Sequence, residues 1–211
     1  RLYRQRKHQP LNPHQNQHQT GCNACGVGLI NITYRTIKYQ EIAQLVLEKA
    51  VKSNDTLSTA KAYSYLGDYY ASQGVSDSAF LHYFKAEKIY IKQDDKLNLA
   101  KTRLNKALLQ YKESDYLGCE ISVFKALRVL KGEKADETLY ELYNLLGLVY
   151  NELGEYDKSI EFHNKALISF DKNPTPVEYQ SKATSMNNMG LVYLNMTKYE
   201  KAIPYFQKGL E

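Results

Sequence analysis

The segment Tyr143–Tyr150 reads YNLLGLVY and decides the fold, because related segments occur four times in the chain. Near-copies are YSYLGDYY at 63–70 and MNNMGLVY at 186–193, and a more distant copy is RLNKALLQ at 103–110. A short turn and a second helical run follow each copy. Self-similarity on this scale is the signature of a solenoid of stacked helix pairs, and such solenoids commonly present a long binding surface.

A small residue lies near the centre of each copy. These anchor residues are Gly67, Ala107, Gly147 and Gly190, at offsets of 40, 40 and 43 residues. A side chain this small lets two helix backbones approach closely. Further small residues follow 12 and 19 positions after each anchor, and they are Ala79, Cys119, Ser159, Ala202 and then Ala86, Ala126, Ala166, Gly209. This spacing keeps them on one stripe of the second helix, so we expect each unit to be a tightly packed helix pair.

The pattern resembles the tetratricopeptide repeat (TPR) family, whose units read W-x2-L-G-x2-Y and then A-x3-F at a period of 34. The first unit matches through Tyr63, Leu66, Gly67, Tyr70, Ala79, Tyr83 and Ala86, with tyrosine in place of tryptophan. The fourth matches through Met189, Gly190, Tyr193, Tyr199, Ala202 and Phe206. The second departs most, with Lys106, Ala107 and Gln110 in place of Leu, Gly and Tyr. The resemblance implies an all-α, right-handed α-solenoid with a long period of about 40 residues.

The extra residues of this long period must lengthen either the second helix of each pair or the links between pairs. The links we expect are 92–96, 131–134 and 171–176. The last contains Pro174 and Pro176, which stop one helix before the next begins.

Two regions of different composition divide the chain. Residues 1–37 are expected to be a basic, Gln- and His-rich lead-in, either native or added for expression, and residues 38–211 a solenoid. Within the solenoid we expect a partial repeat at 38–52 and full repeats at 60–92, 100–131, 140–171 and 183–211. The last repeat ends without a polar capping helix, which solenoids need, so we expect it to be truncated.

The net charge of +5 belongs to the start of the chain rather than to the repeats. Residues 1–40 hold six basic residues and no acidic one, which leaves 22 basic and 23 acidic residues in the remainder. A neutral solenoid argues against nucleic acid as its partner, since phosphate binding needs clustered Lys and Arg. The sequence also shows no apolar run long enough for a membrane span and no signal peptide, which favours a cytoplasmic location.

One candidate metal site lies in the lead-in. His14, His18, Cys22 and Cys25 are four side chains that zinc accepts, at close spacing. The alternative is a solvated tail with two unrelated cysteines, and the ligand order matches no common zinc finger. We therefore expect no cofactor, with zinc as the open alternative. Cys119 occupies a small-residue position and is expected to be buried and unreactive.

In the TPR family the first helices of successive repeats line a concave groove. The resemblance implies that groove residues lie two and three positions before each anchor, and one, four and five after it. From these we predict a peptide-binding set of Ser64, Asp68, Asn105, Leu108, Tyr111, Asn144, Leu148, Asn151, Asn187, Asn188, Leu191 and Asn195. Leu104 and Leu145 fall at equivalent positions and are also expected to be exposed.

Asparagine and leucine recur along this predicted groove. A carboxamide both donates and accepts hydrogen bonds, so a row of them can pair with the backbone of an extended peptide. Leucines between the amides offer apolar pockets. The arrangement is similar to the asparagine-lined grooves of kinesin light chain and of bacterial TPR receptors for signalling peptides. The alternative is that asparagine merely suits a solvated surface, although it is a poor helix former.

Other uses of the fold are less well supported by the residues. A carboxylate clamp needs basic side chains on the first helices, and only Lys61 and Lys101 lie near the required positions. His82 and His163 have no evident acid or nucleophile partner, and no phosphate loop or metalloprotease motif occurs, so we expect no enzyme. We therefore predict a protein- or peptide-binding module, the sensing or docking part of a larger bacterial signalling protein. The alternative is a scaffold that self-associates through its uncapped last repeat.

Overall fold

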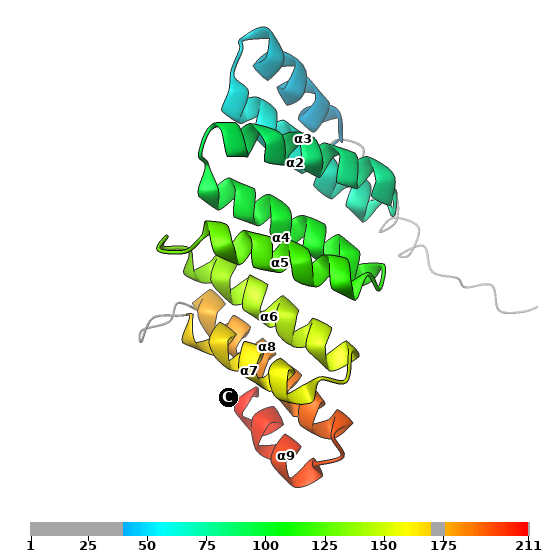
Figure 1. Ribbon diagram of the computed structural model, residues 1–211, viewed down its shortest axis with the longest axis vertical. Coiled ribbons are helices and arrows are strands. Elements are labelled where there is room, and N and C mark those ends of the chain that lie inside the picture. Colours follow the sequence, from blue (N-terminus) through cyan, green and yellow to red (C-terminus); the bar gives the residue numbers. More distant parts are fainter. Residues whose placement is uncertain (1–39, 170–175, 211) are drawn as a thin grey trace, which may run out of the picture. The chain divides into compact units, whose positions relative to one another are not determined.

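The computed structural model describes residues 40–169 and 176–210, all within the compact unit Lys38–Glu211 (Figure 1). This part of the chain is helical, and residues 40–52 form a helical segment that precedes the full repeats. The helices that follow are α2 (Thr56–Ser72), α3 (Ser76–Lys92), α4 (Lys96–Lys112), α5 (Tyr116–Val129), α6 (Asp136–Glu152), α7 (Tyr156–Ile168), α8 (Pro176–Asn195) and α9 (Tyr199–Lys208). The predicted all-α solenoid is confirmed.

The 40-residue period comes from two similar halves. The first helices α2, α4, α6 and α8 begin at 40-residue intervals, and each of the first three is 17 residues long. Several junctions place one residue in the left-handed region at intervals of 20, and these residues are Asn54, Gly74, Asp94 and Ser114. From α2 to α4, a 17-residue helix is therefore followed by a three-residue turn, whether the turn lies within a helix pair or joins one pair to the next.

The residues beyond the family period lie mainly in the helices. The link between α3 and α4 is as short as the turn within a pair, and α3 is as long as α2. Only after α5, which has 14 residues, does a longer link of residues 130–135 appear. The 43-residue offset of Gly190 has a separate cause, since α8 is 20 residues long and three longer than the other first helices. The predicted 171–176 link lies largely outside the described residues.

Aspartates cap three of these helices at their N-termini. Asp55, Asp95 and Asp115 each accept a hydrogen bond at about 3 Å from the backbone N–H three residues later. Such a cap satisfies one of the amides that the first turn leaves without a partner. The other carboxylate oxygen of Asp115, Oδ2, accepts from Gln110 Nε2 at 2.9 Å. Gln110, which departs from the family tyrosine, in turn accepts from Ser122 at 2.6 Å and joins α4 to α5.

Each helix pair closes around its anchor residue and the residue 16 positions later. A Cβ added at Gly67, Gly147 or Gly190 would lie only 2.5–2.7 Å from a ring on the second helix. The rings belong to Tyr83, His163 and Phe206, respectively. In the second unit the larger anchor Ala107 is matched by the smaller Val123, both fully buried in one core cluster. Anchor and partner thus compensate in size, which is why the second unit tolerates alanine.

The pairs stack so that first helices meet first helices. Contacts join α2 to α4, α4 to α6 and α6 to α8, whereas the described second helices make none with one another. The larger core cluster spans α4 to α7 and includes Leu104, Leu142, Leu145 and Leu146. The four first helices therefore form one continuous face, which positions the site described below.

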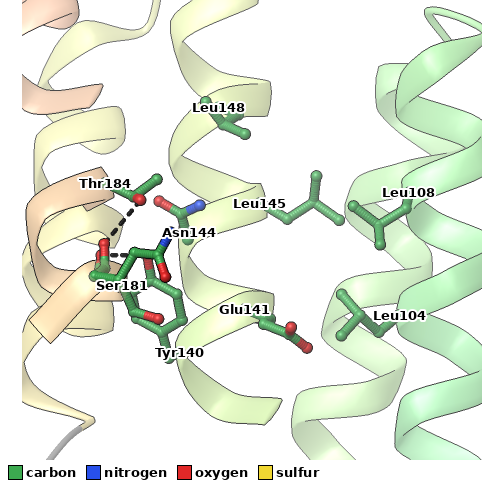
Figure 2. A pocket seen from close by; sticks show the side chains of 10 residues that line it. Leu104, Leu108, Tyr140, Glu141, Asn144, Leu145, Leu148, Ser181 and Thr184 are labelled. Atoms are coloured by element: carbon green, nitrogen blue, oxygen red, sulfur yellow. Dashed lines mark hydrogen bonds between the residues drawn. The ribbon is translucent and has the colours of Figure 1, made fainter. Parts of the chain in front are cut away.

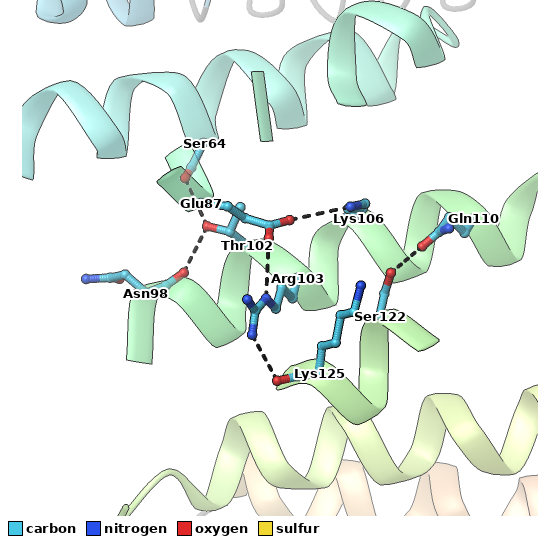
Figure 3. Close-up of polar contacts among 9 residues, drawn as sticks. All are labelled: Ser64, Glu87, Asn98, Thr102, Arg103, Lys106, Gln110, Ser122 and Lys125. Atoms are coloured by element: carbon cyan, nitrogen blue, oxygen red, sulfur yellow. Dashed lines mark hydrogen bonds and ion pairs between the residues drawn. The ribbon is translucent and has the colours of Figure 1, made fainter. Parts of the chain in front are cut away.

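A polar network on α3, α4 and α5 fixes the second repeat against the first (Figure 3). Glu87 of α3 forms ion pairs with Arg103 and Lys106 of α4, at 3.4 and 3.5 Å. Arg103 continues to α5, where its Nη1 donates to the backbone oxygen of Lys125 at 2.9 Å. Glu87 and Arg103 are mostly buried, so removing Glu87 would leave the charge of Arg103 without its ion-pair partner.

Candidate functional site

Three adjoining hollows follow the first-helix face, and together they form what we call the groove. The first lies between α2 and α4, has a volume of about 370 Å³, and shares Asp68 and Asn105 with the second. The second, about 280 Å³, shares Leu108 with the third. The third, of about 320 Å³, lies between α4, α6 and α8. Because each hollow shares walls with the next, an extended ligand could contact all three.

The third hollow is mainly apolar, and we call it the leucine pocket (Figure 2). Leu104 and Leu108 line it from α4, and Leu145 and Leu148 from α6. The polar part of its wall comes from α6 and α8 and comprises Tyr140, Glu141, Asn144, Gln180, Ser181 and Thr184. Its size is at the lower end of the range for ligand pockets, which suits a single side chain rather than a whole small molecule.

The first hollow has a different chemical character. Lys61 and Lys101 lie on its rim together with Ser64, Tyr65, Asp68 and Asn98. Asp68 accepts two hydrogen bonds at 2.8 Å, from Tyr83 OH and Asn105 Nδ2. Burial raises the pKa of Asp68 above its usual value, although these two hydrogen bonds oppose the shift. The groove is thus polar between α2 and α4 and mainly apolar between α4 and α6.

Asparagines on neighbouring first helices bind one another between repeats. Asn188 Nδ2 of α8 donates to Asn144 Oδ1 of α6 at 3.1 Å, and Asn195 Nδ2 donates to Asn151 Oδ1 at 3.0 Å. Asn105 makes the corresponding bond to Asp68 between α4 and α2. One carboxamide group of each pair is therefore already engaged in holding adjacent first helices together. These amides stabilise the stack in addition to any contact they make with a ligand.

The predicted site residues divide into those that line the hollows and those that do not. Ser64, Asp68, Asn105, Leu108, Asn144 and Leu148 line them. Asn187 lies elsewhere, since its Oδ1 is 2.2 Å from the position a Cβ would take on Gly209. The remaining predicted residues, on the first helices but outside the described hollow linings, are Tyr111, Asn151, Asn188, Leu191 and Asn195.

Two expectations about exposure were wrong. Leu104 and Leu145 are only 3% and 2% exposed, because they belong to the core cluster between α4 and α6. Their side chains form the floor of the leucine pocket rather than free surface. Contacts between neighbouring repeats bury them, and such contacts cannot be read from the pattern of one repeat alone.

Further lining residues lie one helical turn before the predicted set, which did not include them. Glu141 and Thr184 line the leucine pocket, and Lys61 and Lys101 line the first hollow. All four lie six positions before their anchors, on the same stripe as the residues three before. Extending the stripe by one turn towards the N-terminus would have found them.

Two buried titratable groups, His163 and Cys119, lie between helices and outside the described hollow linings. His163 is fully buried against Gly147, and burial lowers its pKa to about 4. Its Nδ1 donates to Asn144 Oδ1 at 3.0 Å, whereas its Nε2 has no partner among the described residues. Cys119 is buried as expected, and burial raises the pKa of its thiol to about 12. A thiol in this state is unreactive.

Residues 40–169 and 176–210 contain no group of three or more His, Cys, Asp or Glu placed to hold a metal ion. The zinc candidates His14, His18, Cys22 and Cys25 lie outside the described residues. Among the described helices, none combines the length and the apolar character that crossing a membrane requires.

Comparison with known proteins identifies the repeats. Residues 138–211 match the family model described as tetratricopeptide repeat. The structure of BtubC (BKLC) from P. vanneervenii is similar at a TM-score of 0.74 and 19% identity, over 86% of this chain and 74% of that chain. A putative kinesin light chain from Podospora anserina with nearly identical TPR-like repeats gives 0.63 and 12%, over 84% and 86%. A MamA protein gives 0.52 and 19%, over 82% and 91%.

No curated protein sequence gives a significant match to this chain. The structural neighbours are less than 25% identical to it and so establish the fold alone. Residues 138–211 therefore match tetratricopeptide repeats, and α2–α9 together have the fold of a tetratricopeptide-repeat solenoid. This fold supports a role as a protein–protein interaction module.

Proposed function

We propose that the groove binds an extended peptide segment of a partner protein, and that the chain is a binding module rather than an enzyme. The observation that supports this most strongly is the leucine pocket. Leu108 and Leu148 remain accessible there above a floor of buried leucines, and polar groups surround them. Such a pocket can select an apolar side chain or stem, while amides along the same face bind the peptide backbone.

We further propose that this module serves as the sensing or docking part of a larger bacterial signalling or regulatory protein. The lengthened, 40-residue repeat resembles the TPR sensor regions of such proteins. The proposal concerns biological context, and the groove can bind a peptide whether or not this context is correct.

The double variant Leu108→Ser, Leu148→Ser tests the groove directly. It is expected to weaken binding by at least ~10-fold, because each leucine loses burial worth about 1.5–3 kcal/mol. Neither residue belongs to the buried core, so the fold should be retained. Binding would be measured by fluorescence polarisation with a labelled positional-scanning nonapeptide library. Truncating Asn144 would be a poorer test, since it also bonds to Asn188 and His163.

A matched control is Leu117→Ser on α5. Leu117 is 68% exposed and lies on a second helix, away from the groove. The Leu117→Ser substitution should leave peptide binding unchanged, although it removes an apolar side chain of the same size. Equal binding by the wild type and the double variant, or equal loss in the control, would contradict the proposal.

The exposed apolar residues of α9 favour a second candidate, self-association through the last repeat. Tyr199 and Ile203 are both more than half exposed, and a contiguous apolar surface commonly marks an interface. We expect Ile203→Glu to convert a self-associating chain into a monomer in sedimentation velocity experiments. A wild type that sediments as a monomer at high concentration would exclude this candidate and leave the groove proposal intact.

A further inference from the structure

Among the described residues that line the leucine pocket, Glu141 is the one acidic side chain. It extends from α6 towards Leu104 of α4 (Figure 2). Leu104 and Leu108 lie on one side of it, and Leu145 and Leu148 on its own helix. The exposed Glu141 carboxylate is solvated in the empty pocket, and a ligand that covers it without bringing a positive charge would remove that solvation.

No described cation neutralises Glu141. The ion pairs of the described residues involve Glu87, Glu133, Glu155 and Glu161, and none involves Glu141. Desolvation raises the pKa of Glu141, and the nearby Glu137 raises it further, whereas Lys101 has the opposite but smaller effect. Lys101 thus influences Glu141 from a distance without pairing with it.

Three other polar side chains of the pocket, those of Tyr140, Asn144 and Thr184, already have partners. Tyr140 OH donates to the backbone oxygen of Ser181 at 2.5 Å, and Thr184 Oγ1 donates to that of Gln180 at 2.9 Å. Asn144 Oδ1 accepts from both Asn188 and His163. The Glu141 carboxylate is therefore the strongest acceptor in the pocket that is left for a ligand.

The charge at this stripe position also changes sign along the groove. The residues six before the anchors are Lys61, Lys101, Glu141 and Thr184. Two lysines therefore face the first hollow, and a glutamate faces the leucine pocket. A ligand that complements this order carries its positive charge at the third and fourth repeats.

We propose that the leucine pocket takes a lysine or arginine side chain of the bound peptide, an inference that rests on the groove being the peptide site. The methylene stem packs on Leu108 and Leu148 above the buried leucines, and the cationic head reaches Glu141. Long basic side chains commonly combine apolar packing of the stem with a charged or solvated tip. A purely aliphatic side chain fills the same space, but it would cover the carboxylate without compensating its charge.

The nonapeptide library tests this when one position at a time is fixed as arginine, norleucine or glutamate. With the wild-type chain, arginine is expected to bind at least ~10-fold tighter than norleucine at one position, because a hydrogen bond to a charged group is worth that factor. With Glu141→Gln, the affinities for the arginine and norleucine peptides should become nearly equal. Glu141→Lys should reverse the preference in favour of glutamate. Glu141 is exposed, so both variants are expected to fold as the wild type does.

Glu137→Lys is the matched control, since it changes the same charge on the same helix one turn earlier and does not line the pocket. It should keep the preference for arginine. If the control loses that preference as fully as Glu141→Lys, the effect is long-range and the proposal is overturned. Equal wild-type affinity for arginine and norleucine also overturns it, and loss of binding in the Leu108→Ser, Leu148→Ser variant would show separately that the groove itself binds peptide.

Discussion

Gly147→Ala is expected to lower the free energy of unfolding by about 2 kcal/mol, even though alanine is the better helix former. The added Cβ would lie 2.5–2.6 Å from three atoms of the His163 ring. His163 is fully buried and hydrogen-bonded to Asn144, so it cannot move aside without losing that bond. Urea denaturation followed by circular dichroism gives the change.

The second repeat provides the compensating substitution. There Ala107 packs with Val123 in the positions that Gly147 and His163 occupy in the third repeat. The double variant Gly147→Ala, His163→Val should therefore be more stable than the sum of the two single changes predicts, by about 1–2 kcal/mol. Additive effects would show that anchor and partner do not compensate in size.

Lowering the pH from 7 to 4 is expected to cost the wild-type fold about 3 kcal/mol through His163 alone. Burial lowers the pKa of His163 from 6.5 to about 4 in the folded chain. Between these two pH values the unfolded chain binds the proton and the folded chain does not. The contribution is therefore fully present above pH 6.5, and it is lost as the pH falls to about 4.

His163→Phe isolates this contribution. Phenylalanine occupies the equivalent position in the fourth repeat, where Phe206 packs on Gly190, and it carries no proton. All other groups titrate in both chains, so the difference in stability between wild type and variant reports His163. That difference should shift by about 3 kcal/mol in favour of the variant between pH 7 and pH 4. A constant difference across this range would mean that His163 is protonated equally in both states.

The repeats and the all-α solenoid could be predicted from the sequence because they depend on local spacing. Glycines and alanines at fixed intervals record the close approach of two helices in one pair. The division into 20-residue halves was missed, although Asp55, Asp95 and Asp115 mark three helix starts. The spacing of the anchor residues carries no information about where a helix begins or ends.

The candidate site could be predicted only in part, because contacts between repeats decide its final form. The first-helix face was identified through positions such as Asn105, Leu108 and Asn144, which do line the hollows. Whether an asparagine faces a ligand or its counterpart on the next helix depends on how the pairs stack. The Asn188–Asn144 hydrogen bond joins residues that are 44 positions apart in the sequence. The pattern of a single repeat carries no information about contacts between residues in different repeats.

Leucine methyl NMR with a spin-labelled peptide tests the central claim most directly. A library peptide that binds would carry a nitroxide, and broadening of each leucine methyl signal would report its distance from the label. We expect the signals of Leu108 and Leu148 in the groove to broaden, and those of the exposed Leu81 on α3 and Leu117 on α5 to stay sharp. Broadening of Leu81 and Leu117 with Leu108 and Leu148 unchanged would place the ligand on the second helices and contradict the account.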